Sequence, residues 1–249
     1  MTHSSFEYRM TARLLLFGAL AGVTTLAACS DSTTTGPRKT ADAGRVRFVN
    51  ATTDTAVAKT LAVRVDDVPL TGSVAYGAAT AYVPTYVGAR HFVGRRADVA
   101  VANPAFDATV TVAQPADYTV LATGSGSDLS LLVLADVNTA PPTDMAEVRV
   151  VDAAAAAGSV DVYVTTTTAD LATSTPVATA LSFRGATPYV NVPAGAATRI
   201  RLTTAGTTTV QLDVTTAKLL AGQIRTVVAL EKAGGGSPLT SATLVDRNP

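Results

Sequence analysis

The segment Thr198-Arg-Ile-Arg-Leu202 decides the fold class, because its polar and apolar side chains alternate one by one. Side chains of a β-strand point alternately to opposite faces, so Ile200 and Leu202 are expected to face a core. Arg199 and Arg201 are expected to face water on the other side. A helix would instead need apolar residues three to four positions apart. The segment therefore predicts a half-buried β-strand.

The same alternation recurs along the chain. It is found in RVRFV (45–49), LAVRVD (61–66), ATVTV (108–112), SVDVYV (159–164) and VQLDV (210–214). Thr and Val dominate, and their branched side chains favour strands. The continuous apolar segment LSLLVLA (129–135) predicts a strand buried on both faces, and DAAAAAG (152–158) predicts a turn or a single helical turn. The chain is therefore expected to be all-β.

One pattern occurs twice. VRFVN (46–50) returns as VRVVD (148–152), YGAATAYV (76–83) as FRGATPYV (183–190), YTVLA (118–122) as RTVVA (225–229), and Asp136 as Asp246. Four blocks in the same order indicate an internal duplication. Adjacent prolines between the copies favour a fairly stiff linker. We therefore predict two tandem antiparallel immunoglobulin-like β-sandwich domains, at 45–137 and 146–249, joined by a linker at 138–145.

The motifs of the second copy resemble one known family. VRVVD (148–152), VDVYV (160–164), ATPYVNVPAG (186–195) and TVVA (226–229) are similar to DUF4397, a domain of unknown function in bacterial envelope proteins. The first copy departs from this pattern, with PTYVG (84–88) in place of VPAG. The resemblance implies a β-sandwich and an envelope location, and it implies no activity.

The first residues predict export. Arg9 and Arg13 precede an apolar run that ends in small residues, as in a secretory signal. From Leu14 to Ala28 this run is shorter than the roughly 20 residues that a membrane-spanning helix needs. Either Met1 or Met10 can serve as the start, because both leave a positively charged segment before the run.

The single cysteine of the chain lies at the end of this leader. LAAC (26–29) resembles the lipobox of bacterial lipoproteins, which implies cleavage between Ala28 and Cys29 and a diacylglycerol on the Cys29 thiol. The alternative is a conventional signal peptide with a cysteine nearby. Residues 1–28 are then the signal and 29–44 a polar, flexible tether that holds the ectodomain about 20 Å from the anchor. A serine directly after the lipidated cysteine, here Ser30, is typical of sorting to the outer membrane. Location in the inner membrane is the alternative.

Composition excludes several classes of partner. Of the 249 residues, 47% are hydrophobic, which is enough for a buried core and argues against disorder. Lys and Arg number 19, as do Asp and Glu, so the formal net charge is zero. A nucleic-acid-binding surface needs a basic excess, and none is present. We expect no nucleic acid partner.

Residues that could support catalysis are few. His91 is the only histidine after the leader, and we expect a strand residue facing solvent or a hydrogen bond. Asp66 and Asp67 could contribute to a calcium site, but a solvated turn is the favoured interpretation. Asp136 and Asp246 are interpreted as turn or domain-end residues. We therefore expect no cofactor, no metal site and no enzymatic activity.

Aromatic residues offer one candidate binding position. Tyr76, Tyr82, Tyr86 and Phe92 lie close together in the sequence, and tyrosines can stack on sugars or anchor a protein. Tyr76 and Tyr82 have aromatic counterparts in the second copy and are expected to be core residues. Tyr86 has none, so it is the candidate for an exposed ligand-binding side chain.

Three functions remain open. The favoured one is a non-catalytic binding or adhesion module, held at the membrane by its lipid, that recognises a polysaccharide or another envelope protein. The second is a purely structural envelope protein without a discrete ligand. The third is a glycan hydrolase that uses carboxylates alone, which requires two of them about 5 to 10 Å apart in a cleft.

Overall fold

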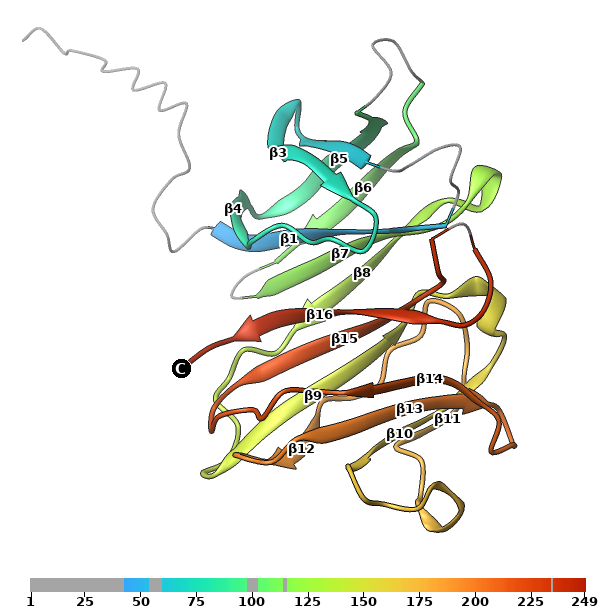
Figure 1. Cartoon of the computed structure of the whole chain (residues 1–249). Coiled ribbons are helices and arrows are strands. Elements are labelled where there is room, and N and C mark those ends of the chain that lie inside the picture. The colour runs from blue at the N-terminus through green and yellow to red at the C-terminus, as the bar shows by residue number, and fades with distance from the viewer. Residues whose placement is uncertain (1–42, 54–59, 98–102, 114–115, 234) are drawn as a thin grey trace, which may run out of the picture. The chain divides into compact units, whose positions relative to one another are not determined.

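The computed structural model describes residues 43–53, 60–97, 103–113, 116–233 and 235–249. This described chain is all-β, as predicted (Figure 1). Its helical parts are three short 3₁₀ turns at Gly126–Asp128, Ala155–Ala157 and Leu171–Thr173. No helix among the described residues is long and apolar enough to cross a membrane.

Strands β1 to β8, here called the first half, are β1 (Ala43–Thr52), β2 (Thr60–Val65), β3 (Val68–Ala75), β4 (Val83–Tyr86), β5 (Gly88–Arg96), β6 (Phe106–Val112), β7 (Asp117–Gly124) and β8 (Ser130–Asp136). They form sheet A, in the order β4-β1-β7-β8, and sheet B, in the order β3-β2-β5-β6.

Strands β9 to β16, the second half, are β9 (Met145–Asp152), β10 (Val160–Thr166), β11 (Ala178–Leu181), β12 (Val190–Pro193), β13 (Thr198–Thr204), β14 (Val210–Thr215), β15 (Ile224–Leu230) and β16 (Thr240–Arg247). They form sheet C, in the order β12-β9-β15-β16, and sheet D, in the order β11-β10-β13-β14. The strand order of the first half is thus found again in the second, with β9 in the place of β1.

Sheets A and C are mixed, which differs from the purely antiparallel sandwich predicted. β1 pairs with β7 in parallel, with Val46 opposite Tyr118, and β9 pairs with β15 in parallel, with Val148 opposite Arg225. The other described strand pairs are antiparallel. Parallel neighbours need a long connection, and here the whole of sheet B or D is inserted between the paired strands.

Each half buries a core between its two sheets. In the first half the core contains the aromatic side chains Phe48, Phe92 and Phe106, and the rings of Phe48 and Phe106 stack at 5.8 Å. In the second half it is aliphatic, with Ile200, Leu202 and a row of valines. Burial of each such side chain stabilises the fold by about 1.5 to 3 kcal/mol.

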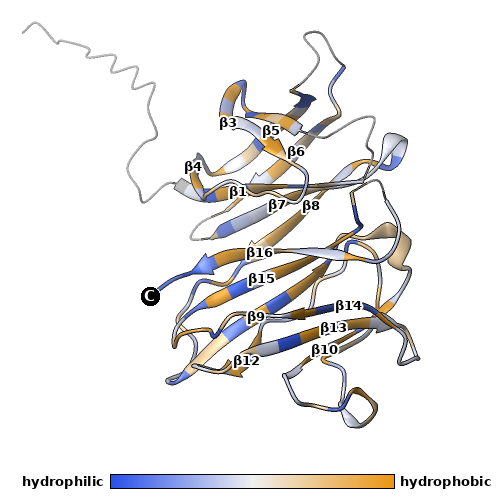
Figure 2. Ribbon diagram, viewed as in Figure 1, coloured by the Kyte–Doolittle hydropathy of each residue, from blue (hydrophilic) through white to orange (hydrophobic). Residues whose placement is uncertain are grey.

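A third cluster joins the halves through the outer faces of sheets A and C. Its fully buried members are Val49, Ala51, Leu121, Val151, Ala153, Val228, Leu230 and Leu244. The two middle strands of each sheet therefore bury both faces, and β1 alternates between the sandwich core (Phe48) and this interface (Val49). In β8, Leu131 packs on the core and Leu132 on the interface, although both remain half-exposed at the sheet edge. Figure 2 shows hydrophilic positions inside the largely hydrophobic β9 and β13.

The alternation rule fails at Arg201, which was predicted to face water and is only 4% exposed. The chain that follows β10 covers this part of sheet D. The guanidinium of Arg201 donates there to Thr165 Oγ1 at 3.2 Å and to the Ala169 carbonyl at 3.1 Å. Arg199, on the same face, is half-exposed and pairs with Asp213 at 2.5 Å. Local pattern gives the face on which a side chain lies, and a distant loop decides whether water reaches it.

Candidate functional site: crossed ion pairs and an adjoining groove

Arg47 reaches from the first half into the second. Its Nε donates to Thr119 Oγ1 on the neighbouring strand β7, at 2.8 Å. Its Nη1 donates to the Val245 carbonyl of β16 at 3.0 Å, and its Nη2 to Asp246 Oδ1 at 2.5 Å. The Arg47 and Asp246 side chains are 3% and 0% exposed, so this ion pair is removed from water.

Arg149 makes the same three contacts in the opposite direction. Its Nε donates to Thr226 Oγ1 at 3.1 Å, Nη1 to the Ala135 carbonyl at 3.1 Å, and Nη2 to Asp136 Oδ1 at 2.5 Å. The arginines therefore cross, and each half neutralises the carboxylate of the other. Such a reciprocal contact is the hallmark of a two-fold, isologous interface, here formed within one chain.

Each carboxylate is completed by a threonine and a tyrosine of its own half. Asp136 Oδ2 accepts from Thr119 Oγ1 and from the Tyr82 hydroxyl, both at 2.6 Å. Asp246 Oδ2 accepts from Thr226 Oγ1 at 2.6 Å and from the Tyr189 hydroxyl at 2.9 Å.

The two tyrosines also lie against the crossing arginines. The guanidinium carbon of Arg47 lies 4.7 Å from the Tyr82 ring centroid, and that of Arg149 lies 4.7 Å from the Tyr189 ring centroid. Burial, and then the adjacent carboxylate, raise the pKa of Tyr82 and of Tyr189 well above the usual value. Both phenols therefore stay protonated and act as donors.

Asp136 and Asp246 were interpreted as turn or domain-end residues; they do lie near the ends of the last strands of the two halves, but this network corrects the turn interpretation. Both lie within strands and are buried, at 7% exposure for the whole residue. They were correctly recognised as equivalent, but each pairs with an arginine of the other half, 13 positions away for Asp136 and 199 positions away for Asp246, and not with local amides. Because both are neutralised and buried, they cannot serve as the carboxylate pair of a glycan hydrolase.

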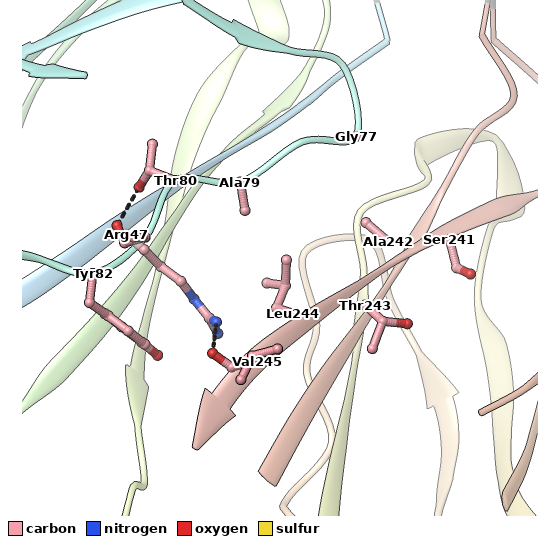
Figure 3. A pocket seen from close by; sticks show the side chains of 11 residues that line it. Arg47, Gly77, Ala79, Thr80, Tyr82, Ser241, Ala242, Thr243, Leu244 and Val245 are labelled. Carbon is pink, nitrogen blue, oxygen red and sulfur yellow. Dashed lines mark hydrogen bonds between the residues drawn. The ribbon is translucent and has the colours of Figure 1, made fainter. Parts of the chain in front are cut away.

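A groove opens beside this network, between residues 77–82 of the first half and β16 of the second. It has a volume of about 560 Å³ and is lined by Arg47, Gly77, Ala79, Thr80, Ala81, Tyr82 and the five residues from Ser241 to Val245 (Figure 3). Its lining contains no carboxylate, histidine or cysteine. The one charged lining residue, Arg47, is held by Asp246.

Comparison of the two halves explains why the groove is open. Gly77 has a positive φ of 73°, and the residue at the same place in the second half is Arg184, with a φ of 67°. Arg184 crosses to the first half, where it donates to Thr123 Oγ1 at 2.9 Å and to the carbonyl and carboxylate of Asp128. Gly77 sends no side chain across. The sequence repeat contains this Gly/Arg difference, but only the structure shows what it leaves open.

The candidate aromatic residues lie in different environments. Tyr76 and Tyr82 were expected in the core, but both are only half-buried. The Tyr82 hydroxyl donates to Asp136 while the residue lines the groove, and the Tyr76 hydroxyl donates to the Glu231 carbonyl at 2.8 Å. Tyr86 lies on the edge strand β4, is 38% exposed, and is not part of the groove lining. Its role in binding stays a prediction.

His91 and the acidic pair Asp66–Asp67 gather at one end of sheet B. His91 Nε2 lies 2.6 Å from Asp107 Oδ1, and this hydrogen bond is the main cause that raises the pKa of His91. Asp66 and Asp67 form the tight turn between β2 and β3, both with positive φ. The Asp66 carboxylate accepts from Arg90 and from the His91 amide. The described residues contain no cluster suited to a metal ion, and the turn interpretation fits this geometry.

One buried carboxylate lacks a full set of donors. Asp152 is inaccessible to solvent; its Oδ1 accepts from the Ala154 amide at 2.9 Å, and its Oδ2 has no hydrogen-bond partner within the described residues. Burial raises the pKa of Asp152 to about 6, and the charge of Glu231 adds to the rise. Asn50 takes the same place in the first half, where its side-chain amide donates to the Val74 carbonyl.

Residues 44–163 match the family described as "Domain of unknown function (DUF4397)". The match begins in β1 and ends in β10, so it includes all of the first half and the start of the second. Membership of a second DUF4397 repeat, the lipobox and the signal peptide stay predictions; Ala28 and Cys29 lie outside the described residues. Among curated proteins, no significant relative is found.

Three solved structures are similar to this chain at low identity. A family 26 carbohydrate-binding module from Eubacterium rectale, solved with maltoheptaose, has 8% identity and a TM-score of 0.27, over 83% of this chain and 98% of that one. A family 41 module from streptococcal virulence factors has 13% identity and a TM-score of 0.27, over 80% and 97%. The Bacillus anthracis TIE protein has 9% identity and a TM-score of 0.25, over 82% and 44%. Similarity at this level does not extend to function.

Proposed function

We propose that this protein is a non-catalytic binding module of the bacterial cell envelope, anchored to a membrane through Cys29, whose ligand occupies the groove between residues 77–82 and β16. The observation that carries the proposal is the groove itself: a recess of about 560 Å³ with hydroxyls and backbone groups in its walls and no carboxylate, histidine or cysteine to activate them. The ligand is a polysaccharide or another envelope protein.

The interface between sheets A and C supports a binding role, because it holds the two walls of the groove together. One wall belongs to the first half and the other to the second. Arg47 bonds to Val245 and Asp246 on the far wall. A preformed recess of this kind binds without the entropy cost of ordering its walls.

A pull-down of envelope fractions with the detergent-solubilised full-length protein tests the proposal. The groove-filling variant is Gly77→Arg: a Cβ there would meet only Leu230 Cδ1 at 3.5 Å, and Arg184 shows that an arginine fits this backbone. The matched control is Gly206→Arg, at a φ of 71° in the turn after β13, where a Cβ would meet nothing.

We expect the native protein and Gly206→Arg to retain an envelope component that Gly77→Arg loses. If Gly77→Arg still retains the component, the binding site lies outside the groove. Tyr86→Ala then tests whether the exposed tyrosine contributes to it. If none of the proteins retains a component, a structural lipoprotein without a discrete ligand is the better account.

A further inference from the structure

The groove wall formed by β16 is a free sheet edge. In sheet C, β16 pairs with β15 on one side and with no described strand on the other. The Val245 carbonyl points away from β15, because it accepts from Arg47 across the groove. Backbone groups of a strand alternate in direction, so Ser241 and Thr243 present their N–H and C=O groups to the groove as well.

The opposite wall follows the edge of sheet A in extended form. Asn50 N donates to Ala78 O at 3.1 Å, and Thr80 N donates to Phe48 O at 2.9 Å, on either side of a bridge between Val49 and Ala79. These bonds turn Ala78 O and Thr80 N toward β1. By the same alternation, the N–H and C=O of Ala79 point away from β1, toward the groove.

The chemistry of the walls favours a polypeptide over a sugar. The Arg47 charge is neutralised by Asp246, and most other lining residues are small, hydroxylated or aliphatic, such as Ala79, Ser241 and Thr243. Sugars bind largely by stacking on open aromatic faces. The one aromatic residue of the lining, Tyr82, lies under Arg45 at 5.3 Å and Arg47 at 4.7 Å.

The groove is continuous with the interface between the halves, since Leu244 and Ala242 line one and pack in the other. In the second half, Arg184 takes the place of Gly77 and donates to the carbonyl of Asp128, in the 3₁₀ turn that precedes the equivalent edge strand β8. Beside β16 this position is a glycine, so no side chain crosses from it.

From this geometry, and resting on the proposed function, we propose that the ligand is an extended, uncharged polypeptide segment of a partner protein that adds to sheet C as a strand along β16 in the groove. Strand addition of this kind derives its affinity from main-chain hydrogen bonds. Residues with small or β-branched side chains fit the walls.

The probe is a displayed library of random linear dodecapeptides, selected on the full-length protein. Selected peptides are synthesised with blocked ends, and their affinity is measured by calorimetry. We expect one peptide per chain and a loss of about tenfold or more with Gly77→Arg, but not with Gly206→Arg. Methylation of the alternate peptide amides that pair with β16 should abolish binding, whereas methylation of the intervening amides, which face only Ala79 on the opposite wall, should weaken it far less.

A second variant, Thr243→Pro, removes an N–H that points into the groove and leaves the β15 ladder intact, because proline is tolerated on an edge strand. It should weaken peptide binding about as much as Gly77→Arg, with an unchanged circular dichroism spectrum.

Two results would overturn strand addition: peptides that bind whichever amide is methylated, or binding that Thr243→Pro leaves unchanged. Purified envelope polysaccharide that binds and is blocked by Gly77→Arg, with no peptide selected, would also overturn it while the proposed function stands. Absence of both glycan and peptide binding would refute both proposals.

Discussion

Replacing Arg47 with methionine tests whether the crossed ion pairs hold the halves together. The change keeps much of the apolar volume and removes the guanidinium, so the Asp246 carboxylate, 0% exposed, keeps its charge but loses its ion-pair partner. Breaking one partner of a buried pair costs about 3 to 5 kcal/mol. For a domain of this size, that corresponds to a fall in Tm of about 10 °C.

The assay is urea unfolding of the full-length protein at pH 7.5, followed by circular dichroism. The matched control is Arg199→Met, which breaks an equally short pair with Asp213 whose side chains are 32% and 38% exposed. Exposed pairs contribute about 0 to 1 kcal/mol, so this control should lose far less stability. The ion-pair distances are the same, but the Arg47 pair is buried, and Arg47 also donates to Thr119 and to the Val245 carbonyl.

A double variant separates charge burial from lost packing. Asp246→Asn removes the stranded charge and keeps an oxygen that can accept from Tyr189 and Thr226. Arg47→Met combined with Asp246→Asn should therefore be more stable than Arg47→Met alone by about 1 to 3 kcal/mol. The reasoning is refuted if Arg47→Met costs no more than Arg199→Met, or if the two changes at the buried pair simply add.

Three further changes test separate features. The raised pKa of Asp152 means that stability is lost as pH rises from about 4 through about 6, since the buried carboxyl must then ionise. Asp152→Asn, which copies Asn50, should gain about 3 kcal/mol at pH 7.5 and almost nothing at pH 4 in urea unfolding. Asp107→Asn should lower the pKa of His91 in an NMR titration, because it removes the hydrogen bond to the imidazolium. Cys29→Ser should release the protein from the membrane fraction and abolish the lipid on the N-terminal peptide in mass spectrometry.

Each of these has an outcome that would contradict it. An equal gain from Asp152→Asn at both pH values would show that ionisation is not the cause. An unchanged titration of His91 in Asp107→Asn would exclude the pairing in solution. Membrane retention of Cys29→Ser would point to a signal that is not removed.

The sequence predicted what local chemistry controls. Alternation of polar and apolar residues in segments such as 198–202 predicted the strands, because every second side chain of a strand lies on the same face of the sheet. The recurrence of 46–50 as 148–152 predicted a duplication, and the same strand order is present in both halves. The counterparts of Tyr76 and Tyr82 in the second copy predicted core positions, whereas both residues are half-buried.

Only the tertiary structure decided where the polar residues of these strands go. Arg47 and its acceptor Asp246 are separated by 199 positions, and no local pattern pairs them. Arg201 is buried by the chain after β10. A groove lies beside Gly77, which has no side chain, whereas Arg184 at the equivalent place in the second half reaches across to Thr123. The period of two assigns each side chain to a face. Whether that face meets water, a loop or the other half of the molecule depends on contacts between segments far apart in the chain.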